Sequence, residues 1–360
     1  MIDLEVFGQI TSNTGYGVAT KNITDSLKTL DINLKLSVKG IECDKRFLRP
    51  NINLYIQCPP FKMAYSDRAS SKYKIGYFYW ETDKLPRQWN KSMRWLDEAW
   101  VPCELVRNCL LKDGFSGPIE IVPTPANNSG KIKKMNISID DKNLFLSKNV
   151  FRFYSIFQWH ERKGWKELIS AYFEEFSSED NVVLIVKTMP LKNNVDKIKS
   201  NILNLKRKIN KKNFPMLYLI TKTIEESEIN GIHQYSDCYV SPHHGEGWGM
   251  PIHDAINFKN ELIITKFGGI TEFLDENSAN IITHSMGAVK NMEWCKFYGG
   301  YQNWANPSKK SLKKIMRKVY ESNKDDEKVN NAFNLVKNFD IEGVGKIIYN
   351  ILKKDRFKHL

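Results

Sequence analysis

The sequence predicts a two-domain α/β protein in which two Rossmann-like domains face each other across a cleft. The chain has 360 residues, which is more than a single hydrophobic core usually serves. Short apolar runs alternate with helical patterns along its whole length, and this alternation indicates strand–helix–strand units. A polar stretch over residues 126–149, without an apolar period, separates two strand-rich halves. We therefore expect domains over residues 1–145 and 146–340.

The predicted strands are short, largely apolar and not strictly alternating, as is typical of parallel strands covered on both faces. In the first half they are Leu4–Phe7, Leu34–Val38, Leu54–Gln57, Ile75–Trp80, Trp100–Pro102 and Ile119–Val122. In the second half they are Phe153–Phe157, Val182–Val186, Met216–Ile220, Cys238–Ser241 and Leu262–Ile264. Between them lie helical patterns, clearest over Ile198–Ile209, where apolar residues recur on one face.

The composition is that of a folded protein, with 41% apolar and 12% aromatic residues, and it argues against a disordered chain. The N-terminus lacks the basic start and following apolar run of a secretion signal. No stretch is apolar for long enough to span a bilayer. The six cysteines form no CxxC pair, which favours reduced thiols. We therefore expect a cytoplasmic protein, with a peripheral position at the inner membrane face as an alternative.

The net charge is +13, from 54 Lys and Arg against 41 Asp and Glu. A positive field attracts phosphate-bearing partners, which include nucleic acid, anionic lipid and nucleotides. Lysine and asparagine are abundant throughout the chain, so a biased genome composition explains the charge equally well. The charge alone therefore leaves the partner open.

The first candidate ligand segment is FGQITSNTGYGVATKN, over Phe7–Asn22, where Gly15 and Gly17 lie between a predicted strand and a predicted helix. Glycines let backbone N–H groups approach an anionic or sugar ligand, and a helix N-terminus adds a positive dipole end. An ordinary turn between a strand and a helix is the simpler interpretation of a single GxG.

The second segment runs from Ile75 to Pro102 and places Glu81 and Asp83 just after a predicted strand. Open α/β sheets bind ligands at the carboxyl ends of parallel strands. Glu81 is therefore a candidate ligand contact. For Asp83, capping of the following helix is an equal alternative.

The third segment, FQWHERKGW, places Arg162 and Lys163 between a predicted strand and a helix. Two adjacent cations suit a diphosphate, because arginine offers a planar fork and lysine a point charge. Ordinary surface charge is the alternative. Lys187 closes the apolar run VVLIVK and is a third candidate cation, since a charge at the end of a buried strand usually has a partner.

The fourth and strongest segment combines SPHHGEGWGMPIHDA, over Ser241–Ala255, with FGGITEFL, over Phe267–Leu274. Its glycines crowd two loops at predicted strand ends, where backbone N–H groups can hold a phosphate. Glu246 and Asp254 lie eight residues apart, so the loop and the first helical turn can direct both carboxylates into one pocket. Carboxylates accept hydrogen bonds from sugar and ribose hydroxyls.

GEGWGMPIHDA with FGGITEFL resembles the E-x7-E signature and the following GG-x-x-E of retaining glycosyltransferases with the GT-B fold, specifically glycosyltransferase family 4. The resemblance extends in order along nearly the whole chain. NTGYGVAT is similar to the N-terminal glycine loop, and IGYFYWETDKLP and AWVPCELVRN are similar to acceptor-domain segments of a subgroup. RKGWKELISAY and NWANPSKKSLKKIMRKVY resemble its donor-domain helices.

The resemblance implies a role for each matching residue. Glu246 would lie beside the donor sugar, Asp254 would bind the ribose, and Arg162 with Lys163 would neutralise the diphosphate. Gly15 and Gly17 would close over the donor, and the backbone of Gly247, Trp248, Gly249, Met250 and Pro251 would meet the phosphates. Their positions at predicted strand ends make Lys187, Gly268 and Gly269 further expected donor contacts. The acceptor would bind mainly to the first domain, near Glu81 and Asp83. The C-terminal helix, residues 341–360, would pack back on the first domain.

Two positions depart from the family pattern. The second acidic residue is Asp254 instead of glutamate, and the shorter side chain changes its reach to the ribose. The usual Gly-Arg pair after the first donor-domain strand is replaced by Phe157-Gln158. Either the basic role has moved to Arg162, or the diphosphate site is weaker.

The resulting hypothesis is a retaining transferase that moves a sugar from a UDP- or GDP-sugar to an acceptor hydroxyl, without a metal or a permanently bound cofactor. The acceptor is a glycan or lipid-linked glycan, and basic helices such as KIKSNILNLKRKINKK would then suit an anionic membrane. Hydroxymethylated bases of viral DNA are an alternative that the net charge also fits. A silent nucleotide-sugar-binding subunit is the alternative from another class. The oligomeric state stays open.

Overall fold

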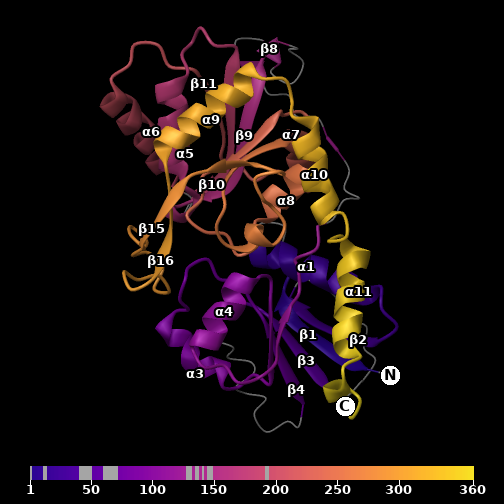
Figure 1. Cartoon of the computed structure of the whole chain (residues 1–360). Helices are drawn as coiled ribbons and strands as arrows, with labels where there is room; N and C mark the ends of the chain where they lie inside the picture. The colour runs from indigo at the N-terminus through magenta and orange to yellow at the C-terminus, as the bar shows by residue number, and fades with distance from the viewer. Residues whose placement is uncertain are drawn as a thin grey trace.

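The protein consists of two α/β domains, each built on a six-stranded parallel sheet (Figure 1). The computed structural model describes residues 2–10, 14–39, 51–59, 72–126, 132–133, 138–139, 142–143, 149–190 and 194–360. The predicted fold class is confirmed. Most of the predicted boundary segment, 126–149, lies outside the described residues.

The first sheet has the strand order β2-β1-β3-β4-β5-β6. Its strands are β1 (Asp3–Gln9), β2 (Asn33–Lys39), β3 (Ile52–Ile56), β4 (Tyr73–Tyr77), β5 (Glu98–Val101) and β6 (Ile119–Ile121). Among the described residues of this domain, the α-helices before the second sheet are α1 (Gly15–Lys28), α3 (Asn90–Met93) and α4 (Glu104–Lys112). All five residues of β3 are buried, as expected for a strand inside a sheet that is covered on both faces.

The second sheet has the order β11-β10-β9-β12-β13-β14. Its strands are β9 (Phe151–Trp159), β10 (Val182–Pro190), β11 (Met216–Ile220), β12 (Cys238–Ser241), β13 (Glu261–Thr265) and β14 (Asn280–Ile282). One face packs on α5 (Trp165–Glu175), α6 (Val195–Ile209) and α9 (Lys309–Glu321). The other face packs on α7 (Glu226–Gln234), α8 (Met250–Asn257) and α10 (Asp326–Val336).

A hairpin outside both sheets joins the two domains. It is formed by β15 (His284–Ala288) and β16 (Asn303–Pro307), which pair antiparallel. The segment between these strands reaches the first domain, where Tyr298 stacks on Trp80 with ring centroids 4.9 Å apart. Lys84 Nζ donates a hydrogen bond to Tyr301 O at 3.2 Å. The sequence did not predict these strands, because NWANP resembles the start of a helical segment.

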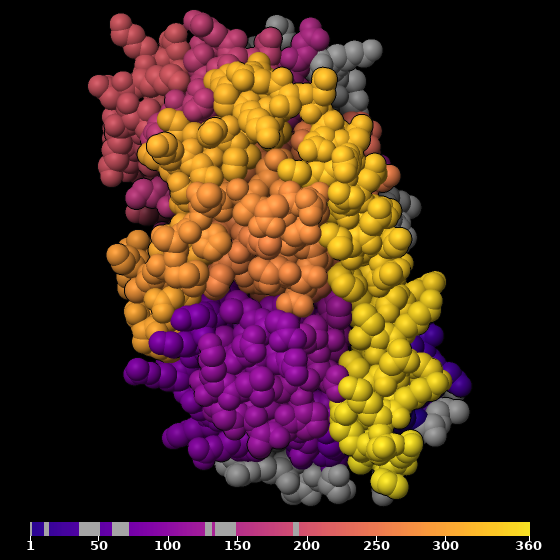
Figure 2. All heavy atoms as spheres, in the orientation of Figure 1, coloured from indigo at the N-terminus to yellow at the C-terminus, as the bar shows by residue number. Residues whose placement is uncertain are grey.

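The C-terminal segment crosses between the domains and covers one side of both (Figures 1 and 2). α10 packs on the second sheet, whereas α11 (Ile341–Leu352) packs on the first sheet through buried Val344 and Ile348. Beyond α11, Arg356 Nε donates to Glu98 Oε2 at 2.6 Å. Ala126 pairs with Asp340 as an isolated parallel bridge, so two interdomain passages of the chain lie side by side. Within the described ranges, no helix combines the length and the apolar character needed to cross a bilayer.

Candidate functional site

The strand order of the second sheet places two of the predicted segments next to each other. β9 and β12 are neighbours, and the connections on either side of this pair leave in opposite directions. Such a switch point is where open α/β sheets bind ligands, outside the carboxyl ends of the strands. The turn η3 (Glu161–Lys163) follows β9, and the glycine-rich loop 242–249 follows β12. Sequence segments about 80 residues apart therefore meet at one edge of the sheet.

Backbone contacts fix the loop that carries Glu246. Gly269 N donates to Glu246 O at 2.7 Å, and Glu246 and Gly268 form a parallel bridge. Gly268 has φ +92°, and a Cβ atom there would lie 2.2 Å from Glu246 O. The conformation and the lack of space both require glycine. The second glycine loop therefore supports the first and holds Glu246 in place.

Replacing Gly268 by alanine is expected to lower the free energy of unfolding by about 3 kcal/mol, because strain and a backbone collision add. Gly114 is a matched control, since its φ is +78° but nothing lies within 4 Å of a Cβ built there. Gly114→Ala should cost about 1 kcal/mol. Urea unfolding of both variants measures the difference. Equal costs would contradict the role of Gly268 as a support.

Glu246 is the centre of a buried charged cluster with Arg162 and Lys163. Lys163 Nζ lies 2.6 Å from Glu246 Oε1, and Arg162 Nη1 lies 3.2 Å from Glu246 Oε2. Arg162 Nη1 also donates to Gly245 O at 2.6 Å. Burial alone would raise the pKa of Glu246, but Lys163 and Arg162 outweigh it and lower this pKa to about 2. The carboxylate is therefore ionised at neutral pH.

The first domain completes the cluster through Glu81. Its Oε1 lies 3.3 Å from Arg162 Nη2, and its Oε2 accepts a hydrogen bond from Tyr298 OH at 2.9 Å. A Cβ on Gly245 would lie 2.1 Å from Glu81 O, so the two backbones are in direct contact across the domain junction. Burial alone would lower the pKa of Arg162, but Glu81 and Glu246 together hold it above its ordinary value. Two cations thus face two carboxylates.

The predicted N-terminal glycines lie within a helix instead of a loop before it, because α1 begins at Gly15. Thr14 caps this helix, and its Oγ1 accepts from Gly17 N at 3.1 Å. A Cβ on Gly15 would lie 3.5 Å from the side chain of Met250, at the start of α8. The glycine segment of the first domain therefore touches the end of the Glu246 loop. Gly17 is buried in the first turn of the helix.

Asp254 lies in α8 beyond its first turn, and no ion pair with Arg162 or Lys163 is found among the described residues. Burial, together with the nearby carboxylate of Glu226, raises the pKa of Asp254 to about 7. Burial raises the pKa of Tyr239, and Glu246 and Asp254 raise it further. The two carboxylates therefore flank one tyrosine but differ in charge state near neutral pH.

Lys187 is buried within β10 instead of closing the strand, because β10 continues to Pro190. Its Nζ donates to Thr188 O at 3.2 Å. Asp83 accepts two hydrogen bonds from Asn303, at 2.6 Å from the backbone N and 2.9 Å from Nδ2. Asp83 therefore joins the first domain to the hairpin, and a role in acceptor binding would require it to exchange this partner.

Two side-chain contacts between the domains were not predicted from the sequence. Tyr298 contacts Glu81 from the segment between β15 and β16, and no motif marks it. Glu272, in η5 (Gly269–Glu272), accepts from Glu104 N at 2.8 Å and so caps α4 of the other domain. Glu272 is the acidic residue of the GG-x-x-E segment, so that motif was the signal available for it.

No family model matches the chain, and no curated protein matches it. Solved structures do match. An E. coli trehalose-6-phosphate structure bound with UDP-2-fluoro glucose has a TM-score of 0.68 at 12% identity, over 98% of this chain and 99% of that chain. Anabaena HepE in complex with UDP and glucose has a TM-score of 0.65 at 11% identity, over 97% of this chain and 99% of that chain. The fold is GT-B.

A third structure agrees with the GT-B assignment. The pneumococcal O-GlcNAc transferase GtfA, in complex with UDP and GlcNAc, has a TM-score of 0.56 at 11% identity, over 84% of this chain and 56% of that chain. Identities this low establish the shared fold. The roles of the individual residues must therefore be argued from the geometry of the site.

Proposed function

We propose that the protein is a glycosyltransferase that moves a sugar from a nucleotide sugar to an acceptor hydroxyl. The observation that carries this proposal is the Glu246 carboxylate, held between Lys163 and Arg162 at the junction of two GT-B domains. The solved structures of similar fold contain UDP-2-fluoro glucose, UDP with glucose, and UDP with GlcNAc. Those ligands support a UDP-sugar as the donor.

The chemistry required is stabilisation of a leaving nucleoside diphosphate. Negative charge develops on the diphosphate as the bond to the sugar breaks, and Arg162, Lys163 and the positive end of the α8 dipole stabilise that charge. Glu246 would then lie beside the sugar, where its ionised carboxylate favours the positive charge that develops on the ring. No permanently bound cofactor and no metal is required in this scheme.

The finer assignment is a retaining enzyme of glycosyltransferase family 4. Glu246 and Asp254 match the spacing of the E-x7-E signature, and FGGITEFL matches the GG-x-x-E segment that follows. A trehalose-6-phosphate synthase of similar fold, described as an enzyme of glycosyltransfer with retention, further supports retention. We assign the acceptor to a glycan or lipid-linked glycan that is reached in the cytoplasm.

Domain separation must precede binding in this scheme. Glu81 O and Gly245 are in direct contact, and Glu246 is 8% exposed, so the closed junction leaves the carboxylate out of reach. Opening would break the contacts of Glu81 with Arg162 and Tyr298, and Glu81 would then be free to meet the acceptor. Closure afterwards would exclude water and limit hydrolysis of the donor.

The proposal is tested by incubating the protein with UDP- and GDP-sugars, first without an acceptor and then with glycan acceptors, and measuring the release of free nucleoside diphosphate. Slow hydrolysis of one donor is expected without acceptor, and faster release with a suitable one. Binding of a nucleotide sugar without turnover of any donor would instead identify a silent binding subunit.

Donor affinity should rise between pH 6 and pH 8. A pKa of about 7 leaves Asp254 partly protonated in the free protein, whereas ribose hydroxyls are better bound by the ionised form, so binding releases a proton. The dissociation constant of UDP-glucose should fall by about threefold to tenfold over this range. Calorimetry of the wild type and Asp254→Asn measures it. An unchanged pH dependence in the variant would contradict the role of Asp254.

A further inference from the structure

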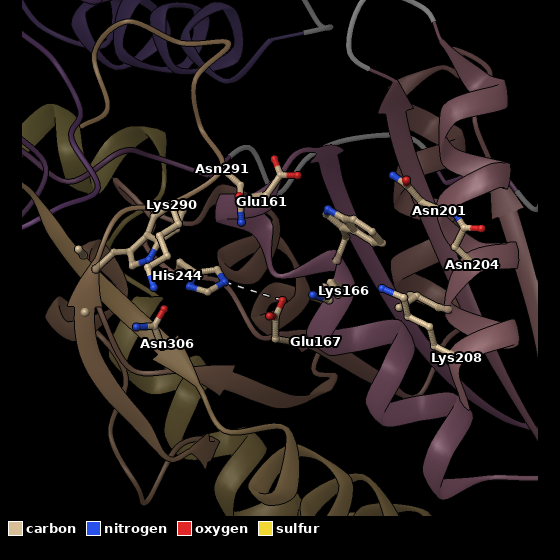
Figure 3. A pocket seen from close by; sticks show the side chains of 15 residues that line it. Glu161, Lys166, Glu167, Asn201, Asn204, Lys208, His244, Lys290, Asn291 and Asn306 are labelled. Carbon is tan, nitrogen blue, oxygen red and sulfur yellow. Dashed lines mark ion pairs between the residues drawn. The ribbon is translucent and has the colours of Figure 1, made fainter. Parts of the chain in front are cut away.

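A pocket of about 550 Å³ lies in the second domain, outside the charged cluster (Figure 3). This volume is within the range of small-molecule sites. Its walls come from three parts of the domain, namely the start of α5, the middle of α6 and the β15–β16 hairpin, with His244 from the loop after β12. The lining includes Asn201, Asn204, Asn291, Asn306, Lys166, Lys208, Lys290, Glu161, Glu167, Trp165 and Trp304.

The polar lining suits a hydroxylated ligand. Four side-chain amides line the pocket, and each offers both a donor and an acceptor, as sugar hydroxyls do. Asn291 is held at the edge of the hairpin with φ +57°, a left-handed conformation that asparagine tolerates better than most residues. The amides therefore come from both α6 and the hairpin and face one cavity.

The charged lining favours an acidic substituent. Three lysines line the pocket against two glutamates. One of those glutamates, Glu167, lies 3.8 Å from His244 Nε2 and is directed at that ring (Figure 3). Lys166, Lys208 and Lys290 are all exposed and make no ion pair among the described residues. Their ammonium groups are therefore available to a carboxylate or phosphate.

The aromatic lining disfavours a planar base. Trp304 is 3% exposed and its ring already packs on His244, with centroids 4.5 Å apart. Trp165 stacks on Trp159 at 4.7 Å. Both rings are largely buried, with Trp304 3% and Trp165 9% exposed, so neither offers a nucleobase a free face for stacking. Hydrogen bonds and charge, instead of stacking, must hold the ligand.

The pocket shares a wall with the charged cluster. His244 N donates to Arg162 O at 2.7 Å, and Ala305 N donates to His244 O at 3.0 Å. His244 is separated from Glu246 by one residue, so the loop that carries Glu246 also forms part of the pocket. A ligand in the pocket would therefore lie behind the loop at which transfer is proposed.

We propose that this pocket binds an acidic sugar unit, carrying a carboxylate or phosphate, of the glycan on which the protein acts. The inference rests on the proposed function, because it treats the pocket as an outer subsite for the acceptor. It adds a substrate class, an acidic glycan, that the charged cluster does not specify.

The test uses two probes, hyaluronan tetrasaccharide as an acidic glycan and maltotetraose as a neutral one, titrated into the full chain by calorimetry. The acidic probe should bind about tenfold more tightly than the neutral one. Lys208→Glu with Lys290→Glu should weaken the acidic probe by about tenfold or more. The control, Lys199→Glu with Lys314→Glu, changes the net charge equally at exposed positions outside this pocket and should leave the affinity unchanged.

Three results would overturn the inference, namely no binding of the acidic probe at millimolar concentration, equal binding of both probes, or equal losses in the two double variants. A parallel titration with glucose 6-phosphate shows whether the pocket accepts a phosphate as the acidic substituent, as well as the carboxylate of hyaluronan. A wild type that turns over no donor would refute the proposed function, whereas the probe titrations judge the pocket independently.

Discussion

Glu246→Gln is expected to lower the rate of sugar transfer by about 100-fold or more while donor affinity stays the same or rises. The carboxylate now neutralises Lys163 and Arg162 at 2.6 and 3.2 Å. In Glu246→Gln, Lys163 and Arg162 attract a diphosphate as strongly as before, because their own charges are unchanged. The reacting sugar, however, loses the anion beside it. Binding and catalysis should therefore separate in this variant.

The same substitution should destabilise the free protein by about 3 kcal/mol, because it leaves buried cations with less compensation. UDP should then raise the melting temperature of Glu246→Gln more than that of the wild type. Glu174→Gln, which loses a pairing with Lys309 at 2.5 Å on the surface, is the control and should keep full activity. Loss of donor binding together with activity would contradict a catalytic role for Glu246.

Lys163→Gln is expected to lower kcat/KM for the donor by about 100-fold to 1,000-fold. Lys163 makes the shortest ion pair of the cluster, at 2.6 Å from Glu246, and its charge would stabilise the diphosphate as the bond to the sugar breaks. The loss should appear in both donor affinity and kcat, because the charge acts on the bound donor and more strongly on the leaving group.

Steady-state kinetics with the donor identified in the sugar panel measure this effect. Lys199→Gln removes the same charge at an exposed position of α6 and should change kcat/KM little. A Lys163→Gln enzyme within about threefold of the wild type would exclude Lys163 from the diphosphate site.

The sequence predicted the fold and the segments of the site because each depends on local pattern. Apolar runs such as VVLIVK predicted buried strands, and polar residues at their ends predicted ligand contacts. Parallel strands place their carboxyl ends at one edge of the sheet. The positions of Arg162 and Glu246 after such strands therefore predict that the two side chains lie close together. The helix α11 packs on the first sheet through Val344 and Ile348.

Contacts made by the β15–β16 hairpin could not be predicted, because the sequence did not predict its strands. Asp83 and Asn303 are 220 residues apart, and only the hairpin brings them together. The strand β16 contains Asn303, Asn306 and Pro307, which are weak strand formers, so tertiary contacts decide its conformation. The raised pKa of Asp254 depends on burial beside Glu226, which spacing along the chain does not show.

The central claim is that a nucleoside diphosphate binds where Lys163, Arg162 and the start of α8 meet. A crystal structure of the protein with UDP tests it most directly. We expect density for the diphosphate beside Lys163 and the N-terminal end of α8, with Glu246 displaced from at least one of its two cations. UDP bound only in the pocket beside His244, with the Glu246 cluster intact, would contradict the account.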